Sequence, residues 1–113
     1  MLNSEEQAQF AQLQALYIDS LPGKKAELHS ALEQVRTAPD EGLRALKVQA
    51  HRIAGSGGGY GFPELSELAR ALELQIIAQL ERQPLSIEPI EQALEQLLTL
   101  MDRLYQQRQS NEC

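Results

Sequence analysis

The stretch AHRIAGSGGGYG, residues 50–61, combines one histidine, His51, with five of the seven glycines of the chain. Before it, apolar residues recur at steps of three and four along residues 43–53, which is the spacing of one helix face. After it, Pro63 suits the first turn of another helix. The stretch therefore predicts a helix that carries His51, runs to the glycine cluster at 55–61 and is followed by a second helix.

The rest of the chain repeats the helical pattern. Apolar spacing predicts helices at about residues 5–20, from the turn at 21–23 to 37, from 40 to the glycines, from 63 to a connector at 83–85, and from 86 to about 105. Expected N-terminal caps are Ser4, in a capping box with Gln7, then Asp40 and Ser86. Pro89 is tolerated in the first turn of the last helix.

No segment alternates with a period of two over a useful length, so the sequence predicts an all-α fold. Short connections favour antiparallel neighbours. We expect an antiparallel up-and-down four-helix bundle with an additional short or bent N-terminal helix. Residues 1–113 form one domain in this interpretation, with a core at about 5–105 and a polar C-terminal tail at 106–113.

Composition limits the partners and the compartment. The 113 residues carry a formal net charge of −6, which argues against a nucleic-acid partner because phosphate binding needs a positive surface. No apolar run approaches the roughly 18 residues of a membrane span. The start of the chain does not resemble a signal peptide, and the single cysteine, Cys113, has no partner for an internal disulfide. We expect a cytoplasmic protein that is a monomer and does not bind membranes.

His51 is predicted to point outward. At about 100° per residue, it lies about 120° from the centre of the apolar stripe of its helix. Residues three, four and seven apart stack on a helix, so other outward positions join it. This predicted docking face comprises Arg44, Lys47, Val48, Gly55 and Gly58. Gly55, one turn after His51, contributes no side chain, and a mid-helix glycine costs about 1 kcal/mol relative to alanine. Such a cost beside an exposed histidine suggests that something has to approach closely.

The surroundings of His51 are locally basic. The window 42–63 contains Arg44, Lys47 and Arg52 and no acidic residue, so it is formally +3 and leaves −9 for the rest of the chain. A cationic patch on an acidic protein favours an anion, such as a phosphoryl group on His51, or an acidic pocket on a partner.

The sequence contains no motif for nucleotide binding, metal binding or nucleophilic catalysis. The glycines do not satisfy the dinucleotide-binding pattern, and the Lys-Ser/Thr ending of a P-loop is absent. Neither histidine has a glutamate three residues before it, as a di-iron bundle needs, and no zinc spacing or nucleophilic triad is visible. His29 has no comparable context. An isolated helical histidine is more often an ordinary surface residue, and a glycine cluster is more often a loop. The two features and the basic window coincide on one face here, and this coincidence favours a site.

The combined pattern resembles the histidine-containing phosphotransfer (HPt) domain family over about residues 10–104. The residues that carry the resemblance are Asp40, Leu43, Ala50-His51, Gly55-Ser56, Gly61, Leu65, Leu68 and Leu72-Glu73. The resemblance implies a four-helix bundle whose exposed histidine relays phosphoryl groups between receiver-domain aspartates. It implies a phosphocarrier without catalytic machinery of its own. The partners would be response-regulator receiver domains, a hybrid histidine kinase, or both.

The resemblance also implies roles for individual residues. The phosphoryl group goes to Nε2 of the histidine, and a Glu or Gln on the next helix, here Glu73, holds Nδ1. Gly55 matches the small residue that lets the partner approach. No cofactor is expected on this chain, because Mg²⁺ belongs to the receiver domain. One position departs from the family pattern: the usual lysine three residues after the histidine is Ala54, so Lys47 or Arg52 would have to replace it.

Three alternatives stay open. A non-phosphorylatable helical adaptor, compatible with Ala54, would bind a receiver or another signalling protein without chemistry. A dimerising bundle without a relay role would need an exposed apolar face, which the sequence does not reveal. A histidine kinase dimerisation helix is a weaker match, because an acidic residue normally follows its histidine and Arg52 stands there.

Overall fold

Helices make up nearly all of the described chain. The computed structural model describes residues 1–82 and 85–111. Its helices are α1 (Ser4–Asp19), α2 (Leu21–Thr37), α3 (Pro39–Gly59), α4 (Pro63–Leu80) and α5 (Glu88–Asn111). The part of the chain within these described ranges contains no β-strand. The prediction of an all-α fold is therefore confirmed, whereas the connector predicted at 83–85 falls mostly outside the described residues.

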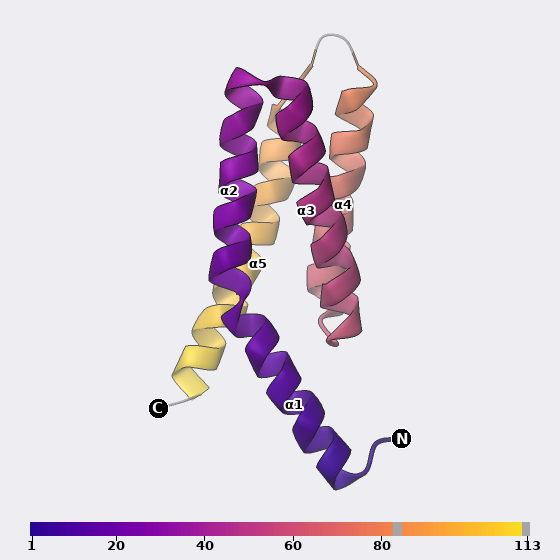
Figure 1. Ribbon diagram of the computed structural model, residues 1–113, viewed down its shortest axis with the longest axis vertical. Helices are drawn as coiled ribbons and strands as arrows, with labels where there is room; N and C mark the ends of the chain where they lie inside the picture. Colours follow the sequence, from indigo (N-terminus) through magenta and orange to yellow (C-terminus); the bar gives the residue numbers. More distant parts are fainter. Residues whose placement is uncertain (83–84, 112–113) are drawn as a thin grey trace.

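Four of the helices form an up-and-down bundle, and α1 extends from one end of it (Figure 1). α3 packs against both α2 and α4, and α5 returns beside α4 and α2. α1 leaves the lower end of α2 at an angle, which lengthens the molecule to 53 Å against 30 and 18 Å in the other directions. The structure therefore has the predicted four-helix bundle with an additional N-terminal helix.

The bend between α1 and α2 lies at Ser20, one residue before the predicted turn at 21–23. Ser20 is both the C-cap of α1 and the N-cap of α2. Pro22 follows in the first turn of α2, where a missing N–H removes no helical hydrogen bond. The proline thus begins the second helix instead of ending the first.

The helix caps differ from the predicted ones. Asn3, not Ser4, caps α1: its side-chain oxygen accepts a hydrogen bond from the Glu6 N–H at 2.8 Å, and the Glu6 carboxylate accepts from the Asn3 N–H at 3.1 Å. Asp40 is not a cap either, because α3 begins with Pro39 and Asp40 lies in its first turn. α5 begins at Glu88 instead of directly after Ser86, whose N–H donates to the side chain of Gln79.

The core follows the apolar stripes that the sequence predicts. Every helix from α2 to α5 contributes residues that are almost fully buried. The largest of these are Leu21, Leu28, Leu43, Leu46, Ile53, Leu65, Leu72, Ile76, Ile90, Leu94, Leu97 and Met101. At about 25 cal/mol per Å² of apolar surface removed from water, such side chains are the main stabilising contribution to a bundle of this size.

α1 is less completely buried than the other helices. Tyr17 is buried, but Leu13 and Leu16 keep 51% and 65% of their surface exposed. The sequence did not reveal this apolar surface, because Leu13 and Leu16 follow helical spacing, which is equally compatible with a helix face that is buried in the core. α1 extends beyond the end of the bundle, so much of it has no neighbouring helix to pack against (Figure 1).

The segment predicted as a polar tail from residue 106 is helical as far as Asn111, where the description of the chain ends. Arg108 anchors it to α1 by donating from Nε and Nη2 to the two carboxylate oxygens of Asp19, at 2.7 and 2.9 Å. These hydrogen bonds hold the pKa of Asp19 below its usual value. The paired guanidinium and carboxylate thus extend α5 beyond the bundle core.

Candidate functional site

The glycine cluster is part of α3 itself. The sequence predicts that the helix runs to the glycines, whereas α3 continues through them to Gly59. It then ends in a Schellman motif: the Phe62 N–H donates to the Gly57 carbonyl at 2.8 Å, and the Gly61 N–H donates to the Gly58 carbonyl at 3.1 Å. Gly61 has φ +84°, a left-handed conformation that glycine adopts without strain. This turn places α4 antiparallel to α3.

Small residues bring α3 and α4 close together. A Cβ atom on Gly57 would lie 3.3 Å from the backbone nitrogen of Ser66, so the absence of a side chain permits the contact. The Ser66 hydroxyl donates to the carbonyl of Ala54 at 2.6 Å. The sequence interpretation missed Ser66, because its role depends on how the two helices are aligned. Together these contacts fix the register of the α3–α4 hairpin.

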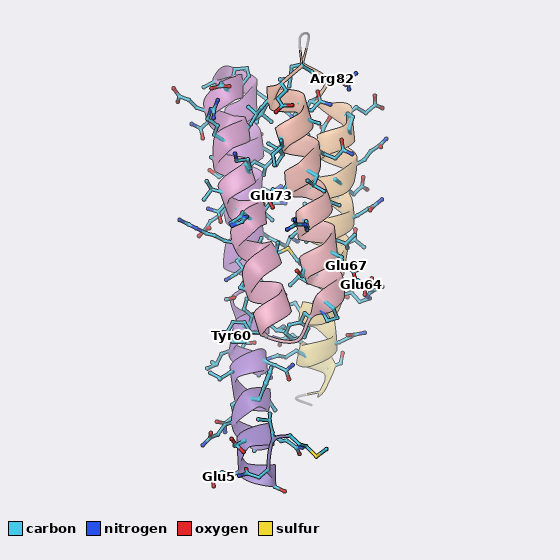
Figure 2. The ribbon with its side chains drawn as sticks, turned by 90° about the vertical axis from the view of Figure 1, so that its right-hand side faces the viewer. Glu5, Tyr60, Glu64, Glu67, Glu73 and Arg82 are labelled. Atoms are coloured by element: carbon cyan, nitrogen blue, oxygen red, sulfur yellow. The ribbon has the colours of Figure 1, made fainter. Side chains whose placement is uncertain are left out.

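The hairpin brings His51 and Glu73 together. His51 Nδ1 and Glu73 Oε2 are 2.8 Å apart, with 73% of the histidine side chain exposed and 14% of the glutamate. Figure 2 shows Glu73 on the edge of α4 that faces α3. Because an ionised carboxylate can only accept, Nδ1 carries the proton in the neutral ring. Nε2 then keeps its lone pair, and the bond holds the ring so that this nitrogen faces outward.

The surface next to His51 lacks side chains. Gly55 and Gly58 follow His51 by four and seven residues and share its face of α3. A Cβ on Gly55 would meet no atom within 4 Å, and one on Gly58 would make an ordinary contact of 3.5 Å with Ser66. Neither glycine is therefore required by packing inside the chain. An approaching partner would find bare backbone beside the lone-pair nitrogen of His51.

Comparison with known families agrees with this geometry. The sequence model of the Hpt domain family matches residues 12–107. The chain belongs to the Hpt domain family. Hpt domains are phosphocarriers that perform histidine phosphotransfer in two-component systems. No curated protein and no solved structure matched this chain.

The basic residues of this Hpt domain are not equally available. Arg44 donates from Nε to Asp40 at 2.9 Å, so its charge is already paired on the surface. Lys47 and Arg52 form no ion pair with any residue that the structure describes. Arg52 lies about 100° around the helix from His51. The predicted patch is thus weaker at Arg44 than its formal charge indicates.

Two exposed apolar side chains lie on the helices that carry His51 and Glu73. Val48, which the sequence places on the face of His51, is 44% exposed, and Leu74, next to Glu73 on α4, is 56% exposed. Sequence reasoning named Val48 but missed Leu74. Apolar side chains around a polar centre are typical of protein-docking surfaces.

α1 braces the glycine-rich end of α3. The Tyr17 hydroxyl and Ser56 Oγ are 2.7 Å apart, and Gln14 donates to the carbonyl of Tyr60 at 2.8 Å. The ring of Tyr17 stacks on that of Tyr60, with centroids 4.7 Å apart, and lies 6.0 Å from that of Phe62. Burial raises the pKa of Tyr17, although the hydrogen bond with Ser56 opposes this effect. The brace therefore uses the neutral phenol.

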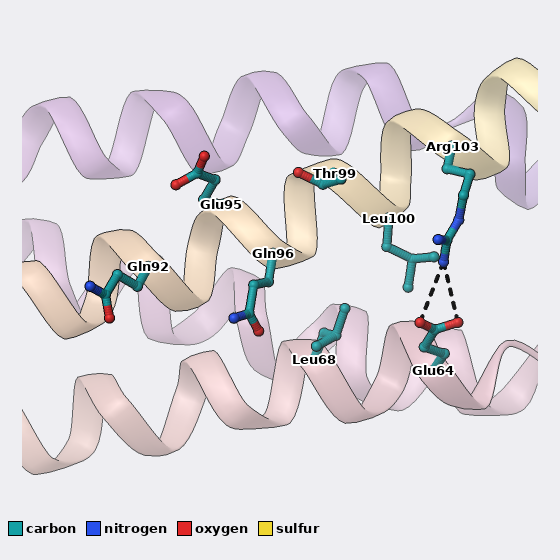
Figure 3. Close-up of a pocket in the computed structure, with 8 residues that line it drawn as sticks. All are labelled: Glu64, Leu68, Gln92, Glu95, Gln96, Thr99, Leu100 and Arg103. Carbon is teal, nitrogen blue, oxygen red and sulfur yellow. Dashed lines mark hydrogen bonds and ion pairs between the residues drawn. The ribbon is translucent and has the colours of Figure 1, made fainter.

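The other candidate features have no connection with His51. His29 is exposed on α2, and residues 1–82 and 85–111 contain no group of three side chains able to hold a metal ion. A groove of about 530 Å³ lies between α4 and α5, and Arg103 donates across one end of it to Glu64 at 3.4 Å (Figure 3). In the part of the chain that is described, no helix is long and apolar enough to span a membrane.

Proposed function

We propose that His51 accepts a phosphoryl group from the aspartate of one receiver domain and passes it to the aspartate of another. The observation that supports this most is the contact between His51 Nδ1 and Glu73, at 2.8 Å. It fixes the tautomer in which the exposed Nε2 is a nucleophile. The open space at Gly55 allows a receiver domain to bring its phosphoaspartate to that nitrogen.

The chemistry balances without a further reactant. The Nε2 lone pair forms an N–P bond as the acyl P–O bond of the phosphoaspartate breaks, and the electron pair of that bond stays on the departing carboxylate. The imidazole ring keeps its Nδ1 proton and gains positive charge, which the carboxylate of Glu73 offsets. In the reverse direction, the carboxylate of the second receiver attacks phosphorus and the ring leaves as neutral imidazole.

The proposed receiver-docking surface consists of Val48, Gly55 and Gly58 around His51 on α3 and of Leu74 on the exposed side of α4, with Lys47 and Arg52 at its edge. Its exposed apolar side chains would contact the receiver, and its unpaired cations would face the acidic pocket that surrounds a receiver aspartate. In this proposal Mg²⁺ enters with the receiver domain and the encounter takes place in the cytoplasm.

The direct test is phosphoryl transfer from a receiver domain charged with acetyl phosphate. We expect the protein to acquire an acid-labile, base-stable label characteristic of phosphohistidine. His51→Gln should abolish the label, whereas His29→Gln should keep it, because His29 is exposed on a different helix and has no comparable surroundings. A label that persists in His51→Gln would disprove the assignment of the site.

The residue at position 54 favours a second function, that of a helical adaptor. Ala54 is half-buried against the core, so the residue one turn after His51 offers no charge for a phosphoryl group. A helical adaptor that binds a receiver without phosphorylation needs no such charge. In that case His51→Ala would leave receiver affinity unchanged and the unaltered protein would never acquire the label. Isothermal titration with the same receiver, combined with the labelling experiment, separates the two functions.

A further inference from the structure

A phosphoryl group on His51 requires a compensating cation. It carries between one and two negative charges at neutral pH. It would be attached to a side chain that is 73% exposed, on a domain with a net charge of −6. On α3 itself, the position one turn after His51 is the apolar Ala54. The neighbouring helix α4 is therefore the place to search for the missing charge.

The register of the α3–α4 hairpin identifies the cation on α4 that lies closest along the helix to the contact between His51 and Glu73. Two hydrogen bonds define this register, one between His51 and Glu73 and the other from Ser66 to the carbonyl of Ala54. Arg70 lies on α4 between Glu73 and Ser66, one turn from Glu73. Residues three apart are neighbours on one side of a helix. Arg70 is consequently next to Glu73 on the edge of α4 that faces α3, one turn closer to the glycines.

Arg70 is also one of the few cations without a partner. Among the residues that the structure describes, Lys25, Arg36, Arg44, Arg103 and Arg108 form ion pairs. Lys24 donates to Ser20 and lies over the ring of Tyr17. Lys47, Arg52, Arg70 and Arg82 remain unpaired within the same described ranges, and the first three of these belong to the two helices of the site.

The acidic residues close to Arg70 do not pair with it. Glu67, one turn before it on α4, lies with Glu64 on the edge of α4 that points away from α3 (Figure 2). Glu73, one turn after it, is bound to His51. In the described part of the chain, no ion pair within 4 Å joins either carboxylate to the Arg70 guanidinium. The exposed Arg70 side chain is thus free to turn toward an anion.

The other two unpaired cations are less well placed. Arg52 lies about 100° around α3 from His51 and away from α4. Lys47 precedes His51 by one turn and is on the opposite side from Gly55, over which the phosphoryl group has to arrive. Arg70 lies one turn from Glu73 in the direction of the glycines, and a Cβ on Gly55 would meet no atom within 4 Å. A guanidinium also matches a phosphoryl group better than an ammonium, because its planar donors can engage two oxygens at once.

We propose that Arg70 binds the phosphoryl group on Nε2 of His51 and so supplies from α4 the positive charge that α3 lacks at Ala54. This inference rests on the proposed phosphotransfer function and adds a phosphoryl-binding residue to it. Arg70 stabilises the phosphorylated form of the protein, and it thereby shifts the equilibrium of the phosphoryl group from the receiver domain toward His51.

The test compares Arg70→Gln with Arg82→Gln, a matched control, because Arg82 is also exposed and unpaired in the described part of the chain but lies past the end of α4 that is far from the glycines (Figure 2). Each variant is equilibrated with the acetyl-phosphate-charged receiver, and the distribution of label between receiver and His51 is measured, followed by the half-life of the isolated phosphohistidine. For Arg70→Gln we expect the ratio of label on His51 to label on the receiver to fall about two- to five-fold, which is the effect of an exposed ion pair. Arg82→Gln should leave it unchanged. Circular dichroism checks that both variants keep their helices.

A second arm restores the charge on α3. Ala54→Lys in the Arg70→Gln background should return the label toward His51 and slow the hydrolysis of phosphohistidine. Equal ratios for Arg70→Gln and Arg82→Gln, or a larger shift for Lys47→Gln than for Arg70→Gln, would overturn the role of Arg70 while leaving phosphotransfer intact. An unaltered protein that never acquires the label would overturn the proposed function and, with it, this inference.

Discussion

Gly42 and Gly55 occupy the same helix for opposite reasons. A Cβ on Gly42 would lie 2.7 Å from Val35 Cα and 2.8 Å from the carbonyl carbon of Gln34, so α2 can approach α3 only because the side chain is missing. A Cβ on Gly55 would meet nothing within 4 Å. The first glycine is explained by the interior of this chain, whereas the second is explained only by something outside it. The comparison separates residues that build the fold from residues that keep a surface open.

The largest expected effect concerns Gly42, the glycine that packs against α2. Gly42→Ala should lower the free energy of unfolding by about 2 kcal/mol, because the added methyl group pushes against backbone atoms of α2 that cannot rotate away. Urea unfolding followed by circular dichroism measures the change. Phosphoryl transfer per folded molecule should be preserved. A Gly42→Ala variant as stable as the parent would mean that α2 and α3 do not approach as closely as described.

The second prediction concerns Gly55, the glycine on the open surface beside His51. Gly55→Leu should raise the stability by up to about 1 kcal/mol, because leucine favours the helix more than glycine does. It should also slow phosphoryl transfer about ten-fold, which corresponds to roughly 1.4 kcal/mol, by obstructing the receiver. The transfer rate from a charged receiver and the unfolding free energy are measured on the same preparation.

Gly23→Leu provides the matched control for this prediction. Gly23 lies in the first turn of α2, and a Cβ there also meets nothing within 4 Å. Its substitution should leave the transfer rate unchanged. If both leucine variants slow transfer equally, the open surface at Gly55 has no special role in docking.

The smallest effect concerns a contact that belongs to the fold alone. Because Arg108 lowers the pKa of Asp19, the ionised carboxylate stabilises the folded state above the usual pKa of about 4, and this contribution is lost as the pH falls through the lowered value. Asp19→Asn should therefore lower Tm slightly at pH 7, with a difference that vanishes on acidification. Thermal unfolding from pH 7 to 3 checks this, and phosphotransfer at pH 7 should not change.

The helices could be predicted from the sequence because apolar side chains repeat at helical spacing over more than two turns in each of them. The caps could not be placed with the same accuracy. Asn3 and Ser4 are both good capping residues, and only the hydrogen bonds of Asn3 with Glu6 decide between them. α3 continues through its glycines because packing against α4 and α1 outweighs the low helix propensity of those residues.

The site was predictable where it depends on one helix. The outward direction of His51 follows from the position of the core stripe, and the bare surface at Gly55 follows from spacing. The contact of His51 with Glu73 was implied only by resemblance to a family, because it depends on the register of two helices. Ser66 and Arg70 were missed for the same reason. Arg44 was overrated, since formal charge does not reveal that Asp40 pairs with it.

The brace between α1 and the last turns of α3 couples local order to a distant helix. Four glycines lie in those turns, at about 1 kcal/mol each relative to alanine, so the segment would fray if α3 stood alone. Tyr17 and Gln14 hold it from outside through Ser56 and Tyr60. Amide hydrogen exchange in residues 56–60 consequently reports how firmly α1 is seated, and any partner that displaces α1 would also loosen the surface beside His51.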